Sequence, residues 1–109
     1  MPENRFRSAF IAMVPDADPS QHRSVVCTSL YELTTVLVRD EDEAVRICGE
    51  LVRKDGVRSL LLCPGFTNRG VARIAEAVGE QISVNVARGD GPSNVAARRA
   101  MEEAGFFKR

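Results

Sequence analysis

The sequence predicts an α/β fold built on an open, four-stranded parallel sheet with helices on both faces. Two observations predict it: apolar strand patterns alternate with helical patterns along the chain, and the connections are long enough for the crossovers that parallel strands need. With 109 residues and 44% hydrophobic content, the chain can bury a core of its own. We therefore expect residues 1–109 to form a single domain.

The first part of the chain is expected to form a strand, a short helix and a second strand. Residues 8–14 make an apolar run that Pro15 ends, which is typical of a buried strand. Asp18 offers an N-cap, and the proline and glutamine after it suit the first turn, so we expect a helix over residues 19–26. Residues 31–39 then alternate apolar and polar side chains, which predicts a strand.

The middle of the chain carries two helices with clear boundaries. Asp40 caps the first, acidic residues fill its first turn, apolar residues recur at helical spacing, and Gly56 ends it. Residues 57–63 follow as the third strand. Residues 68–78 repeat the helical spacing up to Gly79 and form the next helix.

The last part of the chain is expected to add one strand and one helix. Residues 82–88 alternate apolar and polar side chains, which predicts the fourth strand. Ser93 is positioned to cap a helix over residues 94–104. Phe106 and Phe107 follow that helix, and we expect both to fold back onto the core, since adjacent exposed phenylalanines are a liability.

Strand composition predicts the order of the sheet. The strands at 8–14 and 57–63 are apolar on both faces, as central strands are, whereas those at 31–39 and 82–88 alternate, as edge strands do. The order of the four strands is therefore 2-1-3-4, a flavodoxin-like or Rossmann-like arrangement. In such a sheet, ligands bind in the crevice outside the carboxyl ends of the central strands.

A series of short motifs resembles a known family. They are AFI at 9–11, DADP at 16–19 with His22 after it, YELT at 31–34, and Gly65-Phe66 running into the helix at 70–79. In this order they resemble a family of small prokaryotic proteins catalogued only as a domain of unknown function, over residues 8–88. The resemblance implies a compact α/β protein with no established activity or cofactor. Family members carry Val-x-Arg-Phe-Asp after the last strand, and residues 86–90 keep the arginine and the aspartate but not the aromatic residue.

Composition argues against several classes of function. Fifteen basic and fifteen acidic residues leave no broad basic face for nucleic acid or anionic lipid. The apolar run near the N-terminus is too short for a signal segment or a membrane span, so we expect a cytoplasmic protein without a membrane partner. Three widely spaced cysteines and a single histidine do not suit a disulfide framework or a zinc site.

The residues also argue against a metal or a nucleotide cofactor. Asp16, Asp18 and Asp90 carry the oxygen ligands that Mg²⁺ prefers, but helix capping explains Asp18 without a metal. The glycine loop after the third strand lacks the lysine of a P-loop and the glycine spacing of a dinucleotide fingerprint. We expect no metal and no cofactor.

The candidate site lies at the carboxyl edge of the predicted sheet. Gly65 is expected to adopt a positive φ, so that the amides of residues 66–69 face the crevice at a helix N-terminus, where an anion is stabilised. The leading hypothesis is binding of a small anionic metabolite there. The candidate ligand-binding residues are Asp16, Gly65, Phe66, Thr67, Asn68, Arg88 and Asp90.

Two alternative functions stay open. One is a small enzyme that uses Cys63, just before a helix N-terminus, or His22, the single histidine of the chain, as nucleophile or general base. The other is a homo-oligomeric assembly module without catalysis, suggested by the apolar faces of the edge strands and by the two C-terminal phenylalanines.

Overall fold

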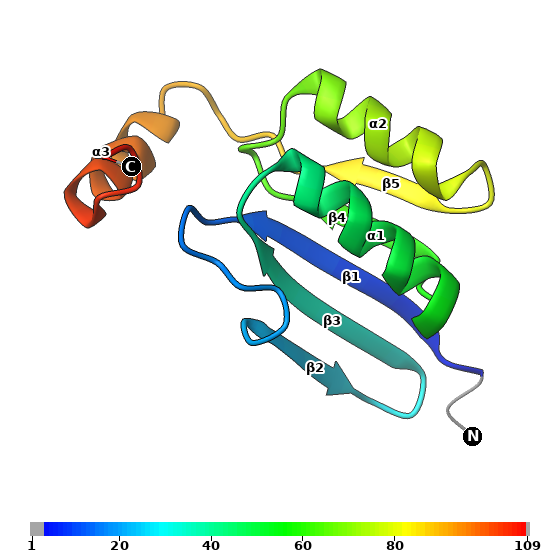
Figure 1. Ribbon diagram of the computed structural model, residues 1–109. Coiled ribbons are helices and arrows are strands. Elements are labelled where there is room, and N and C mark those ends of the chain that lie inside the picture. The colour runs from blue at the N-terminus through cyan, green and yellow to red at the C-terminus, as the bar shows by residue number, and fades with distance from the viewer. Residues whose placement is uncertain (1–3, 109) are drawn as a thin grey trace.

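A mixed five-stranded sheet forms the centre of the structure, a computed structural model that describes residues 4–108 (Figure 1). The sheet order is β2-β3-β1-β4-β5; β1 pairs in parallel with β3 and β4, β5 is parallel to β4, and β2 is antiparallel to β3. The strands are β1 (Phe6–Met13), β2 (Arg23–Cys27), β3 (Tyr31–Val38), β4 (Ser59–Leu62) and β5 (Ser83–Val86), and the helices are α1 (Glu41–Asp55), α2 (Asn68–Val78) and α3 (Asn94–Ala104).

The α/β class is confirmed, but the prediction of a four-stranded, purely parallel sheet is wrong. The four parallel strands lie next to one another in the order β3-β1-β4-β5, and β2 adds an antiparallel strand outside β3. The strand predicted at 31–39 is therefore interior rather than an edge. Alternation along a strand reflects only that successive side chains point to opposite faces of the sheet, and it does not mark an edge strand.

β2 occupies the second half of the segment that was predicted to be a helix over residues 19–26. Asp18 does begin a turn, but the turn does not continue into a helix. The Asp18 side chain accepts a hydrogen bond from the Ser20 amide at 3.0 Å, and the Asp18 carbonyl accepts one from the His22 amide at 2.7 Å. Two adjacent valines follow, and β-branched side chains favour a strand. Pairing with β3 then satisfies the backbone.

The boundaries of α1 are as predicted. Asp40 is the N-cap, and its carboxylate accepts a hydrogen bond from the Glu43 amide at 2.8 Å. Gly56 ends the helix in the left-handed region, with φ of 73°. α2 starts at the predicted residue, with Thr67 as its N-cap. The side chains that α1 and α2 bury against the sheet include Ala44, Ile47, Cys48, Leu51 and Ile74.

Both α1 and α2 cover the same face of the sheet (Figure 1). Ile11, Val36, Leu60 and Leu62 point into the core beneath them and are fully buried. The expectation of helices on both faces was wrong, because α3 lies beyond the end of the sheet instead of on its second face, and none of the α3 residues is buried.

α3 has the predicted bounds, but its N-cap and the phenylalanines after it differ from the prediction. Ser93 makes no side-chain cap to α3; its hydroxyl donates instead to the Asp90 carboxylate at 2.9 Å. Phe106 is half-buried and Phe107 is 50% exposed, stacked under the Arg98 guanidinium at 4.8 Å from the ring centre. The two phenylalanines therefore pack within their own segment and not on the core, which the distance of α3 from the helix-covered face prevents.

Candidate functional site

The loops at the carboxyl edge of the sheet lie side by side, as the parallel topology requires. The Met13 amide at the end of β1 donates to Cys63 Sγ at 3.4 Å, which joins the loops that follow β1 and β4. The Arg88 side chain, after β5, donates to the Pro64 carbonyl and to Asn68 Oδ1, both at 3.1 Å. Arg88 therefore holds the loop between β4 and α2 in place.

The N-terminus of α2 already holds a carboxylate from the same chain. Glu41, the first residue of α1, accepts hydrogen bonds from the Thr67 amide at 2.8 Å and from the Thr67 hydroxyl at 2.9 Å. The Thr67 hydroxyl in turn accepts from the Gly70 amide at 3.0 Å. A negative charge is stabilised at this helix end, as expected from the helix dipole, and Glu41 supplies it.

The glycine loop does not have the conformation that was predicted for it. The glycines with positive φ among the described residues are Gly56, Gly79 and Gly105, so the expectation of a positive φ at Gly65 was wrong. A Cβ at Gly65 would lie 3.4 Å from Met13 Cε, an ordinary contact. The next side chain, Phe66, is buried in the core and takes part in packing.

The remaining candidates at this edge make structural contacts. Asp90 accepts a hydrogen bond from the Ser93 hydroxyl within the loop that leads to α3. Asp16 follows β1 and lies with Pro15 and Phe106 around a hollow of about 150 Å³. The structure thus joins Asn68 and Arg88 by a hydrogen bond, whereas Asp16 lies beside Phe106, on the α3 side.

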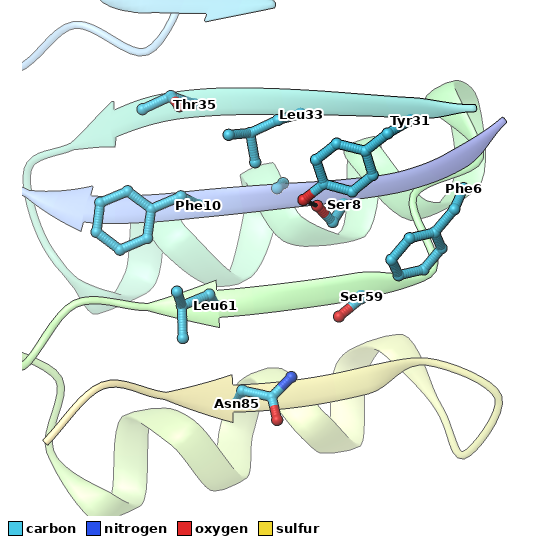
Figure 2. A pocket seen from close by; sticks show the side chains of 10 residues that line it. Phe6, Ser8, Phe10, Tyr31, Leu33, Thr35, Ser59, Leu61 and Asn85 are labelled. Carbon is cyan, nitrogen blue, oxygen red and sulfur yellow. Dashed lines mark hydrogen bonds between the residues drawn. The ribbon is translucent and has the colours of Figure 1, made fainter. Parts of the chain in front are cut away.

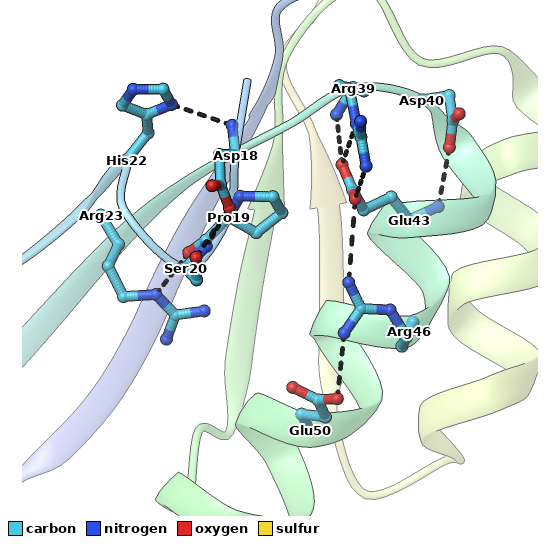
Figure 3. A network of polar contacts seen from close by, with 10 residues as sticks. All are labelled: Asp18, Pro19, Ser20, His22, Arg23, Arg39, Asp40, Glu43, Arg46 and Glu50. Atoms are coloured by element: carbon cyan, nitrogen blue, oxygen red, sulfur yellow. Dashed lines mark hydrogen bonds and ion pairs between the residues drawn. The ribbon is translucent and has the colours of Figure 1, made fainter. Parts of the chain in front are cut away.

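Cys63 and His22 are not brought together. His22 precedes β2 at one edge of the sheet, where its Nδ1 accepts from the Asp18 amide at 2.9 Å (Figure 3). Cys63 follows β4, and the strands β3 and β1 lie between β2 and β4. Three strand spacings amount to about 14 Å, too far for proton transfer between the two side chains.

An ion-pair network runs along the outer side of α1 (Figure 3). Glu43 contacts Arg39 at 3.0 Å and Arg46 at 3.8 Å, and Arg46 reaches Glu50 at 3.2 Å. Hydrogen bonds from the side chain and the backbone of Arg39 hold the pKa of Glu43 below its ordinary value. Both arginines are more than half exposed, so we interpret this network as surface stabilisation of α1.

The second face of the sheet carries the feature that the sequence analysis missed. No helix among the described residues covers it, and it is hollowed to about 520 Å³ (Figure 2). We call this surface the uncovered face. It is formed by Phe6, Ser8, Phe10, Tyr31, Leu33, Thr35, Ser59, Leu61 and Asn85, and Ala9 also lines the hollow.

The uncovered face is apolar and uncharged. None of the described residues that line its hollow is Asp, Glu, Lys or Arg. Its polar groups are partly paired: the hydroxyls of Ser8 and Tyr31 hydrogen-bond to each other, and Asn85 donates to the Leu60 carbonyl at 3.2 Å. Phe6 is 53% exposed and Leu61 is 41% exposed. The presence of uncharged polar residues in place of charged ones along the strands was the signal that could have revealed this face.

These features define a small α/β domain whose mixed sheet has a helical layer on one face. The chain belongs to a family of unknown function, DUF6506, whose family model matches residues 6–102. This confirms the family resemblance that the motif series indicated. No curated protein and no solved structure matches the chain closely enough to count as a relative.

Residues 4–108 contain neither a candidate membrane-spanning helix nor a cluster of metal-ligating side chains. No helix in that part of the chain is long and apolar enough to cross a membrane. Within the same residues, no group of three or more histidine, cysteine, aspartate or glutamate side chains is placed to hold a metal ion.

Proposed function

We propose that this protein is a self-associating α/β module and that a second copy binds to its uncovered face. The observation that carries this proposal is an apolar, uncharged sheet face without a covering layer. Sheets of parallel strands are almost always covered on both faces, and large exposed apolar patches on soluble proteins mark interaction sites.

The surface area of the chain supports this proposal. Its accessible surface is 7064 Å², whereas a monomeric protein of 12.0 kDa exposes about 6,000 Å². Each partner in a standard interface buries about 800 Å², so the excess is large enough for a stable dimer. The radius of gyration, 14.5 Å, likewise exceeds the value of about 13 Å that is usual for a domain of this length.

A matched pair of leucine substitutions tests the proposal. Leu61 lies on the uncovered face, whereas Leu30 lies in the turn between β2 and β3 and is 77% exposed. We expect the wild type to sediment as a dimer, Leu61→Asp as a monomer, and Leu30→Asp as a dimer. Circular dichroism checks the fold, with Leu61→Ser as a milder substitute if the aspartate unfolds the chain. A wild type that stays monomeric at its highest attainable concentration would refute the proposal.

Binding of a small anion at the carboxyl edge is the second candidate function. The observation that favours it is the carboxylate of Glu41 seated on the amide and hydroxyl of Thr67. An external anion would have to replace Glu41, so the variant Glu41→Ala should be stabilised by phosphate or carboxylates more than the wild type in a thermal-shift assay. The variant Glu41→Ala/Thr67→Ala is the control, since it loses the donor hydroxyl. No anion-dependent shift in Glu41→Ala would refute this function.

A further inference from the structure

α3 carries a second apolar surface, which its own chain leaves largely open: only its last residue, Ala104, lines the hollow beside Pro15. Its outer side carries charged residues, including Arg98 and Glu102, which pair at 3.7 Å. Its other side is a narrow apolar stripe at helical spacing. No residue of the helix is buried, although the helix is regular over eleven residues. The stripe consists of Ala97, Ala100, Met101 and Ala104.

The stripe on α3 matches the uncovered face in length and chemistry. A helix of eleven residues is about 16 Å long. The side chains of Phe6 and Phe10, which stand at two ends of the hollow on β1, are separated by about 13 Å along the strand. Three alanines let a helix backbone approach a sheet closely. The face is uncharged, so the helix can bury its stripe there while its charged side stays in water.

The chain's own contacts hold α3 away from its own uncovered face. Arg88 ties the start of the connection to Pro64 and Asn68, so residues 89–93 form the connector that leads to α3. At the other end of the helix, Phe106 lies beside the loop that follows β1. α3 is thus placed beyond the carboxyl edge of its own sheet (Figure 1). To cover its own sheet it would have to leave the loop after β1.

We infer that α3 of one copy packs across the uncovered face of a second copy, and that the exchange is reciprocal. This inference rests on the proposed self-association and specifies which part of the partner forms the interface. In a two-fold symmetric dimer the same contact occurs twice, so the α3 helix of each copy covers the sheet of the other. It also buries the two apolar surfaces that the chain leaves largely open.

Two substitutions on opposite sides of α3 test the inference. Met101 lies in the stripe, and Val95 lies on the other side of the helix, where it is 57% exposed. We expect Met101→Asp to raise the dimer dissociation constant at least about tenfold in sedimentation equilibrium, and Val95→Asp to leave it within about threefold of the wild-type value. If Leu61→Asp dissociates the dimer but Met101→Asp does not, the inference is wrong and the proposed self-association stands. If neither has an effect, both fail.

Disulfide trapping decides which copy supplies the helix. The exposed Cys27 and half-buried Cys63 are first replaced by serine, and Leu61→Cys and Met101→Cys are then made in separate chains. Mild oxidation of the mixture should yield a cross-linked dimer that contains one chain of each kind. The variant with both cysteines in one chain serves as the comparison. If it closes its disulfide within the monomer and the mixture gives no mixed dimer, α3 covers its own sheet and the inference is overturned.

Discussion

Leu60 and Leu61 offer a direct measurement of how the two faces of the sheet differ. They are adjacent on β4 and chemically identical, but Leu60 is fully buried beneath the helices and Leu61 is 41% exposed on the uncovered face. We predict that Leu60→Ala is severely destabilising at every protein concentration. Leu61→Ala should be mild in dilute solution and more costly when the protein is concentrated.

The magnitudes follow from burial. Leu60→Ala removes core atoms and leaves a cavity closed by the helices, a change that costs about 3–5 kcal/mol. Leu61→Ala opens no closed cavity in a single copy, because its side chain faces solvent, and the transfer free energy of its partly buried atoms amounts to about 1 kcal/mol. In a dimer the same side chain is covered. Its removal then approaches the cost of a core truncation.

Urea unfolding followed by circular dichroism measures both values, since the midpoint and slope yield the free energy of unfolding. The titrations are run at protein concentrations below and above the dimer dissociation constant. Equal costs for Leu60→Ala and Leu61→Ala in the dilute sample would show that the second face is covered within one chain. A cost of Leu61→Ala that is independent of concentration would contradict the role of this residue in self-association.

Three further predictions concern other parts of the fold. Burial raises the pKa of the Cys48 thiol to about 12, so in the native protein Cys48 should be alkylated far more slowly than the exposed Cys27. Comparable alkylation rates, measured by mass spectrometry, would mean that α1 does not pack on the sheet. Gly70→Ala should destabilise the protein by about 1 kcal/mol, because its Cβ would lie 2.4 Å from the carboxylate at the start of α1. Gly49→Ala should stabilise α1 by up to about 1 kcal/mol, because its new Cβ meets only the end of a flexible arginine. Thermal unfolding compares the two variants, and a lower unfolding temperature for Gly49→Ala than for Gly70→Ala would refute both predictions. The lowered pKa of Glu43 contributes stability that is present above the ordinary pKa of 4.5 and is lost as the pH falls through the lowered pKa. In Glu43→Gln the free energy of unfolding should therefore fall less steeply over this acidic range. The same pH dependence in wild type and variant would show that the ion pairs of Glu43 contribute nothing.

The parts of the fold that depend on local signals were predictable. α1 carries its own boundaries in Asp40 and Gly56, and neither residue needs a distant partner to act as a cap. The four parallel strands were recognised from their apolar patterns. β2 was missed because Asp18 begins a real turn, and only the pairing of the following residues with β3 decides between strand and helix.

The candidate site was less predictable because its decisive contacts span long stretches of sequence. The bond between Glu41 and Thr67 joins residues 26 positions apart, so the glycine loop gave no sign that a carboxylate from α1 would occupy its helix end. The uncovered face was hidden for a related reason. A pattern along a strand shows which side chains alternate, but not whether another element lies above each face.

The bond between Glu41 and Thr67 also bears on how the native protein opens. The first turn of α2 takes one of its contacts from the first turn of α1, so fraying at the start of either helix removes a partner from the other. The two helix ends should then open cooperatively, with the same free energy of local unfolding. Amide hydrogens in the first turns of α1 and α2 should exchange with solvent together, although the two turns are far apart in the sequence.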